Sequence, residues 1–197
     1  MPRESQPRLP PRDRLMQAAE TLFYQQGILR VTVDAIAEKA ESTKMTLYRH
    51  FASKEAMVLE WIRLLTEDYS SVFERAAERH PNDAVAQILY FTRFITDNLN
   101  ETLHRGCPFT NTLAEAGSHF PEAKERIVTH KQNQFQRLVT LCQQADADDA
   151  LTLAKEITLM LEGAQVAAQN GGFSDVAEFT WQSIASRLQI AVQSAKR

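Results

Sequence analysis

The thirteen residues from Thr43 to Glu55, TKMTLYRHFASKE, hold the side chains with the most specific chemistry in the chain. Two Lys, an Arg, a His and a Tyr stand among few apolar side chains. Arg, Lys and Tyr bind nucleic-acid phosphates, and Arg and Lys also contact base edges. A helix this short is marginal in water by itself and needs neighbours that bury its apolar side. The segment therefore predicts a small helix, held by its neighbours, whose polar face meets a partner such as DNA.

Two further helices can supply these neighbours. Thr32 can cap a short helix over 33–40 and Thr43 can cap a second over 44–50, because a Thr hydroxyl accepts a hydrogen bond from the first turn. Apolar residues at helical spacing predict a preceding helix over 12–26. Two short helices joined by a tight turn and braced by a third form a helix-turn-helix, whose second helix enters the major groove of DNA.

The remainder of the chain has the same helical periodicity. Gly and Pro number only 6 and 7 of 197 residues, and no stretch alternates apolar and polar residues. We therefore predict an all-α protein of about nine helices. Its parts would be a disordered arm over 1–11, a helix-turn-helix DNA-binding domain over 12–52 and a larger helical domain over 53–197, which opens on a long helix capped by Ser53.

The net charge of −3 conceals an asymmetry along the chain. Residues 1–55 hold nine Lys and Arg against seven Asp and Glu, whereas residues 56–197 hold thirteen against eighteen. A polyanionic partner for the first segment is therefore permitted, although the basic excess is small. The first residues lack the apolar segment of a signal peptide, no run reaches the roughly 18 apolar residues of a membrane span, and the two Cys have no framework spacing. A reducing cytoplasm is the expected compartment.

Residues 12–61 resemble the DNA-binding domain of the TetR family of bacterial transcriptional regulators. The resemblance rests on the segments AAETLF, VTVDAIAEKA and TLYRHFASKEAMV and on the spacing between them. The run GCPFTNTLAE at 106–115 is also similar to a segment of many C-terminal domains in the family. The resemblance implies a homodimeric repressor that binds a palindromic DNA operator, needs no cofactor, and leaves the DNA when a small effector enters the domain over 53–197.

The turn between the two short helices departs from the family pattern. Glu41 and Ser42 stand where the family usually has Gly and a small apolar residue. A non-Gly residue with a left-handed backbone costs about 1 kcal/mol, so we expect a slightly reshaped turn. Met45 occupies a position where Gly is common, which should change what the second short helix reads.

Nine residues are predicted to contact DNA. Those expected at base edges or the adjacent backbone are Lys44, Met45, Thr46 and Arg49. Those expected at the DNA backbone are Thr32, Thr43, Tyr48, His50 and Lys54. Tyr48 and Lys54 match phosphate-contacting positions of the family, and the two capping Thr lie at helix N-termini, which attract anions. The alternative for the charged residues is ordinary solvation, and for Tyr48 it is a core position with an exposed hydroxyl.

The basic N-terminal arm offers a further contact with DNA. Its arginines are Arg3, Arg8, Arg12 and Arg14. Such side chains could reach the minor groove beside the recognition helix. The alternative is an arm that is simply disordered.

The last two predicted helices present residues that suit a dimer interface, because small side chains permit close approach and large ones add area. The residues assigned to this interface are Ala164, Ala168, Trp181, Ile184, Ala185 and Leu188. Paired across a two-fold axis, they would form a four-helix bundle and place two recognition helices about one turn of DNA apart. The alternative is that these stripes belong to the core of a single chain.

An effector cavity is expected among the aromatic and apolar residues of the domain over 53–197. The candidate lining is Trp61, Leu65, Phe91, Phe94, Phe109, Phe120, Phe135 and Met160. No acidic or basic cluster stands out among them, so we expect a mostly apolar effector. The alternative for each residue is an ordinary core side chain.

Two other chemistries are left open by the residues. Cys107 follows Arg105 in RGCPF, a setting typical of reactive thiols, so oxidation or an electrophile could switch the same DNA-binding dimer. The alternative is a buried Cys in a turn typical of the family. Ser118, His119 and His130 could serve an all-α enzyme, but the sequence has no nucleophile elbow, phosphate loop or metal-binding spacing. We therefore predict no catalytic residues, no metal and no enzyme activity.

Overall fold

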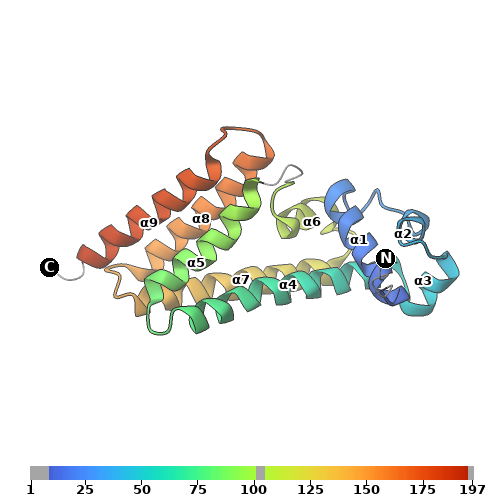
Figure 1. Cartoon of the computed structure of the whole chain (residues 1–197), viewed down its shortest axis with the longest axis horizontal. Coiled ribbons are helices and arrows are strands. Elements are labelled where there is room, and N and C mark those ends of the chain that lie inside the picture. Colours follow the sequence, from blue (N-terminus) through green and yellow to red (C-terminus); the bar gives the residue numbers. More distant parts are fainter. Residues whose placement is uncertain (1–8, 101–104, 195–197) are drawn as a thin grey trace, which may run out of the picture.

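The computed structural model of the protein describes residues 9–100 and 105–194 (Figure 1). Over these residues it contains nine α-helices, one short 3-10 helix and no strand. The elements in chain order are α1 (Pro11–Gln26), α2 (Val33–Lys39), α3 (Lys44–His50), α4 (Lys54–Arg79), α5 (Ala84–Asp97), η1 (Asn98–Asn100), α6 (Pro108–Ala116), α7 (Pro121–Gln144), α8 (Ala150–Gln169) and α9 (Val176–Ser194). The predicted all-α architecture is confirmed.

The molecule is elongated, and its two ends are built differently (Figure 1). We call residues 11–53 the head and residues 54–194 the body. The head gathers α1, α2 and α3 at one end, whereas α5, α8 and α9 pack together at the other. The helices α4 and α7 run side by side along the length, and α6 lies between the head and the far end of the body. Because α4 starts directly after the head, it connects the two ends.

Apolar packing holds α3 in the head. Within α3, all of whose residues are described, Leu47 is the single buried side chain, and Phe51 follows it into the core. Both belong to one cluster with Phe23 of α1, Ile36 of α2 and Trp61 of α4. The helix therefore has the expected form, a short helix whose apolar side is covered by its neighbours.

Hydroxyl caps begin the helices that frame the turn. The side chains of Thr32, Thr43 and Ser53 each accept a hydrogen bond from the main-chain N–H three residues on, at 3.1 Å in every case. Such a cap contributes about 1 kcal/mol to helix stability. The three caps predicted for α2, α3 and α4 are confirmed.

The turn between α2 and α3 is a Schellman motif. The Ser42 N–H donates to the Ala37 carbonyl at 2.9 Å, and the Glu41 N–H donates to the Glu38 carbonyl at 3.0 Å. Glu41 has a φ of 47°, so the left-handed residue expected here is present. The hydrogen bonds are the regular ones of the motif, and the expected reshaping of the turn is not found. Glu41 therefore adopts the left-handed backbone conformation that Gly usually adopts at this position, and it bears the steric cost.

The start of α1 corrects the predicted arm. This helix begins at Pro11, because a residue without an N–H suits the first helical position. The helix therefore includes Arg12 and Arg14, which do not belong to an extended arm. Arg12 Nη2 lies 2.6 Å from Glu60 Oε1. The rest of the predicted arm, residues 1–8 with their two arginines, lies outside the described residues.

The apolar faces of α8 and α9 pack into the core of the body. Ile184 and Leu188 are fully buried, and Ala164 is 5 % exposed. These three residues of the predicted dimer interface therefore belong to the core of the chain itself, since helical periodicity marks a buried face without saying what covers it. The other three are half-buried: Ala168, Trp181 and Ala185. No helix within the described ranges has the length and apolar character that a membrane crossing requires.

Candidate functional site

The helix α3 lies at the outer end of the head (Figure 1). Its exposed face carries basic and amphipathic side chains. Met45 and Tyr48 are 70 % and 49 % exposed. Lys44, Arg49 and His50 are exposed on the same short helix. In a major groove, Arg and Lys pair with guanine edges and apolar groups touch thymine methyls. The arrangement is therefore chemically suited to reading DNA.

The other predicted DNA contacts also keep exposed surface. Thr32 and Thr43 are exposed, whereas Thr46 and Lys54 are half-buried. The hydroxyls of Thr43 and Thr46 lie 2.9 Å apart, and both capping hydroxyls accept helical N–H groups. A phosphate at these positions would therefore meet hydroxyls that are already held in place by the helix ends.

Lys44 has a partner within the head. Its Nζ lies 3.1 Å from Asp34 Oδ2, and both side chains are more than half exposed. A surface ion pair of this kind contributes about 0–1 kcal/mol. A phosphate or a base edge can therefore replace Asp34 with little loss of stability.

A carboxylate from the body holds the loop that follows α1. Glu115 of α6 accepts hydrogen bonds from the N–H groups of Leu29 at 2.7 Å and Ile28 at 3.1 Å. Gly27 has a φ of 86°, and a Cβ there would lie 2.5 Å from Glu115 Oε2. Burial lowers the pKa of Lys54, at the start of α4, and the charge of Glu115 partly opposes that shift. Sequence reasoning missed Glu115, because its partners lie more than 80 residues away.

A second set of contacts ties the end of α1 to the segment before α6. The Arg105 N–H donates to Tyr24 Oη, and Arg105 Nη1 donates to the Tyr24 carbonyl, both at 2.9 Å. The Tyr24 hydroxyl donates to the Gly106 carbonyl at 3.4 Å. Directed polar contacts therefore join the head to the body in addition to apolar packing.

Three cavities meet at Tyr69, near the middle of α4. The first, which we call the α4–α7 cleft, has a volume of about 580 Å³. The junction cavity, between α1, α4 and α5, has about 470 Å³, and a smaller cavity between α7 and α8 has about 200 Å³. Tyr69 lines all three. The two larger volumes fall within the range of about 300–1,000 Å³ that small-molecule sites occupy.

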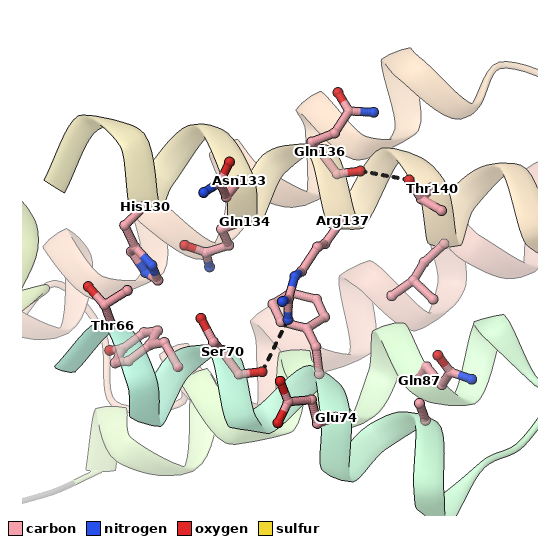
Figure 2. A pocket seen from close by; sticks show the side chains of 14 residues that line it. Thr66, Ser70, Glu74, Gln87, His130, Asn133, Gln134, Gln136, Arg137 and Thr140 are labelled. Carbon is pink, nitrogen blue, oxygen red and sulfur yellow. Dashed lines mark hydrogen bonds between the residues drawn. The ribbon is translucent and has the colours of Figure 1, made fainter. Parts of the chain in front are cut away.

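Polar side chains line the α4–α7 cleft (Figure 2). Ser70 and Glu74 from α4 face His130 and Arg137 from α7, and Arg137 Nη1 donates to the Ser70 carbonyl at 3.2 Å. Burial, and then the charges of Lys131 and Arg137, lower the pKa of His130 to about 4, so its ring is neutral at pH 7. The mostly apolar lining that we expected is not found in this cleft.

The residues predicted to line an effector cavity fall into two groups in the structure, those that line one of the three cavities and those that do not. Trp61, Leu65 and Phe94 line the junction cavity, and Phe135 lines the α7–α8 cavity. The other four line none of the three cavities: Phe91, Phe109, Phe120 and Met160. Phe91 and Phe109 are completely buried in the two main cores, and Phe120 and Met160 pack against those cores. These four residues are core side chains, which was the alternative for each.

Cys107 is 4 % exposed, and its cationic neighbour differs from the predicted one. Lys131 Nζ donates to Cys107 Sγ at 3.5 Å and lies 2.5 Å from Glu162 Oε1. The guanidinium of Arg105 donates to the main chain of α1 instead. Cys142 is buried as well, and burial raises the pKa of its thiol to about 11. Both thiols are free.

Exposed apolar side chains lie along α8 and α9. Leu159 and Val166 on α8 are 72 % and 50 % exposed, and Phe179 and Ile190 on α9 are 57 % and 59 % exposed. Each pair shares a face of its helix, because spacings of seven and eleven residues are close to whole numbers of turns. Gly163 lies between the first pair, and the space where its side chain would be is open. These four residues are exposed and apolar, and the predicted interface did not include them.

An all-α chain with a helix-turn-helix at one end and a cavity-containing helical body at the other has the architecture of a DNA-binding transcription regulator. Two family models match the sequence. The model described as bacterial regulatory proteins of the tetR family matches residues 15–61, and the model described as a tetracyclin repressor-like C-terminal domain matches residues 84–184. The chain belongs to the TetR family of bacterial transcriptional regulators.

Individual relatives agree with this family. The chain is 32 % identical over 114 residues to the HTH-type transcriptional regulator TtgR of Pseudomonas putida, and 31 % identical over 113 residues to the probable regulator ArpR of the same species. Each match covers 53 % of this chain and 54 % of the relative, so the chain spans about half the length of these curated relatives. The crystal structure of SCO4454, a TetR-family regulator from Streptomyces coelicolor, has the same fold with a TM-score of 0.81 at 24 % identity, covering 95 % of this chain and 96 % of that one.

Proposed function

We propose that the protein is a dimeric transcriptional repressor that binds a palindromic operator through α3 and leaves it when a small effector occupies a cavity beside Tyr69. The main support for this proposal is the outer face of α3. Met45, Tyr48 and Arg49 remain exposed on a helix that a single buried side chain, Leu47, anchors to the head. The relatives that the chain matches are transcription regulators rather than enzymes, which supports the same assignment.

The nine predicted DNA contacts fall into two groups: residues that would position the head on the DNA backbone and residues that would read the base sequence. Tyr48 and Lys54 would hold phosphates, which fixes the register of the head on the duplex. Arg49 would pair with a guanine edge or an adjacent phosphate, and Met45 would touch a thymine methyl. On binding DNA, the Lys44 ammonium would leave Asp34 and contact a phosphate or a base edge instead. Each contact uses a side chain that keeps exposed surface in the free protein.

The dimer would form through the exposed faces of α8 and α9. Leu159, Val166, Phe179 and Ile190 supply apolar area, and Gly163 permits close approach of a second copy. Two helices from each subunit would then close a four-helix bundle around a two-fold axis. The half-buried residues of the interface predicted from the sequence would lie at the margin of this bundle.

The switch would act through α4. This helix begins directly after Ser53 in the head and carries Tyr69, which lines all three cavities. A ligand that favours a shifted α4 would move the head, while Glu115 holds the loop after α1 to the body. Such a ligand lowers DNA affinity by its differential affinity for the two arrangements.

Selection of bound sequences from a random duplex pool tests the proposal. Wild type should enrich a palindrome, and Tyr48→Ala and Lys44→Ala should lose that enrichment at both low and moderate salt. Lys155→Ala, which removes an exposed Lys from α8, should keep it. Failure of the wild type to enrich any sequence, or equal enrichment by all four proteins, would show that α3 does not read DNA.

Cys107 offers a second candidate trigger, favoured by its contact with Lys131. The Lys131 ammonium lies beside Cys107 Sγ, the atom that an electrophile would modify. Because Cys107 is almost fully buried, an adduct would displace core side chains and disturb α6. N-ethylmaleimide should then release DNA from the wild type and from Cys142→Ser, but not from Cys107→Ser. Release that survives Cys107→Ser would remove this candidate.

A further inference from the structure

The junction cavity lies where the head meets the body. Its volume is about 470 Å³, and its walls come from α1, α4, α5 and the segment around Gly106. We propose that this cavity binds an organic cation, a ligand with a positively charged nitrogen among apolar groups, and that this ligand is the effector. The proposal rests on the function proposed above and specifies the site and the chemical class of its ligand.

Aromatic rings form much of the cavity wall. Tyr24, Trp61, Tyr69 and Phe94 all line it, and Trp61 is 2 % exposed. The rings of Tyr69 and Phe94 meet edge to face with centroids 5.2 Å apart. An aromatic face attracts a cation within about 6 Å of its centroid, and Trp does so most strongly. The wall would therefore hold a cation with apolar substituents better than a small hydrated ion.

Two carboxylates add a preference for positive charge. Glu20 of α1 and Asp68 of α4 line the cavity and are exposed, so they lie at its mouth. Among the residues that the structure describes, no Lys, Arg or His lines this cavity. Neither carboxylate forms a salt bridge with any other residue in the part of the chain that the structure describes. Partial burial of its carboxyl group, and then the charge of Asp68, raise the pKa of Glu20, so the two negative groups disfavour each other. A cation between them would remove that repulsion.

A buried donor points independently to a ligand. Trp61 Nε1 is buried and has no hydrogen-bond acceptor among the described residues, on a ring that lines the cavity. An unsatisfied buried donor is costly, and native proteins usually pair such groups. An oxygen acceptor on a ligand would pair the indole N–H only if the Trp61 ring turned toward the cavity, because the nitrogen itself has no accessible surface. Such an acceptor would strengthen the binding of an organic cation that the rings and the carboxylates already favour.

The α4–α7 cleft differs in charge and suits a different ligand (Figure 2). Among the described residues, its lining includes one acidic residue, Glu74, and one basic residue, Arg137, and the neutral ring of His130 lies among several amide side chains. This cleft has no excess of negative charge. A cation that can reach both cavities should therefore prefer the junction cavity, which makes Glu74 a matched control for Glu20 and Asp68.

Occupation of the junction cavity would change how the head sits on the body. The cation would contact Glu20 and Tyr24 on α1 and Asp68 and Tyr69 on α4, so one ligand would bridge two helices that position α3. Neutralising the repulsion between the two carboxylates would draw α1 and α4 together at this point. The operator would be released if, in this arrangement, the distance between the two heads of a dimer no longer matches the spacing of the DNA half-sites.

Three probes with one aromatic ring and different charges test the proposal. Isothermal titration calorimetry on the full chain would compare benzyltrimethylammonium, neutral 2-phenylethanol and phenylmethanesulfonate. The cation should bind at least about tenfold more tightly than the other two, because both the rings and the carboxylates favour it. The variant Glu20→Gln/Asp68→Asn should weaken the cation about tenfold, and Glu74→Gln should change it less than about twofold. Thermal unfolding would verify that each variant is folded.

Each other outcome overturns the inference. Equal binding of the three probes, an equal effect of Glu74→Gln, or no binding of the cation at millimolar concentration would show that the junction cavity does not select positive charge. Binding of the selected operator would be measured on the same preparations. Operator binding without cation binding would contradict this inference alone, whereas cation binding without any operator binding would contradict the proposed function instead.

Discussion

The head and the body place their polar side chains in opposite ways. In the head, Lys44 and Arg49 face outward from a helix that Leu47 anchors from within. In the body and at its junction with the head, polar and charged side chains line cavities that meet at Tyr69. The outward face suits a large, flat partner such as a duplex, whereas the cavities suit a small molecule. The four predictions below test this contrast, from the largest expected effect to the smallest.

The anchoring of α3 should depend on one side chain. Leu47→Ala removes the single buried residue of α3 and should lower the free energy of unfolding by about 2–5 kcal/mol. Met45→Ala, on the exposed face, should change it by less than about 0.5 kcal/mol. Urea unfolding followed by circular dichroism would measure both. Similar losses for the two variants would mean that the two faces of α3 are not distinct.

The α4–α7 cleft should make the body sensitive to acid. His130 has a pKa of about 4 in the folded chain against an ordinary 6.5, so the unfolded chain takes up a proton first as the pH falls. Above pH 6.5 the His130 ring is neutral in both the folded and the unfolded chain. Between pH 6.5 and 4 the free energy of unfolding falls by up to about 3 kcal/mol. Thermal unfolding across that range should show the slope in wild type and a shallower one in His130→Gln. An imidazole that titrates near 6.5 by NMR would contradict the assignment.

The link between head and body should weaken when one charge is removed. Glu115→Gln keeps the shape but cannot accept both the Ile28 and Leu29 N–H groups with a carboxylate, which should cost about 1–2 kcal/mol locally. Hydrogen exchange at those two amides should accelerate. Glu125→Gln, an exposed acid on α7, is the control and should leave both amides unchanged. Unaltered exchange in Glu115→Gln would show that this contact does not hold the loop.

The turn before α3 should tolerate, and gain from, a glycine. Glu41→Gly relieves a left-handed residue with a φ of 47°, and after the extra chain entropy of Gly we expect a gain of about 0.5–1 kcal/mol. Glu38→Gly, at a helical position in α2, should instead lose about 1 kcal/mol. A loss of stability in both variants would mean that Glu41 contributes more through its side chain than its backbone strain costs.

Most of the head could be predicted from sequence because its signals are local. Thr32, Thr43 and Ser53 act within three residues of themselves, and Leu47 marks the inward side of a helix by its spacing. The left-handed residue at Glu41 was expected from the resemblance, because the family usually has Gly at that position. Helical stripes also gave the all-α class and the approximate number of helices.

The cavities could not be predicted, because they form between helices that are distant in the sequence. Spacing marked Ile184 as part of an apolar helix face, which we assigned to a dimer interface, but it could not say whether its own chain or a second copy covers that face. Phe91 and Trp61 looked alike as aromatic residues on helices, yet only Trp61 lines one of the three cavities at Tyr69. Glu20 and Asp68 lie on different helices, and nothing local to either one predicts that they share a cavity mouth.

Fluorescence anisotropy with the selected duplex and a scrambled duplex tests most directly whether the outer face of α3 reads DNA. For Arg49→Ala we predict that affinity for the selected duplex falls about tenfold or more while affinity for the scrambled duplex changes much less, because a base contact carries about 1–3 kcal/mol of discrimination. Lys155→Ala should match the wild type on both duplexes. An unchanged ratio of the two affinities in Arg49→Ala, or equal losses in Arg49→Ala and Lys155→Ala, would contradict the account.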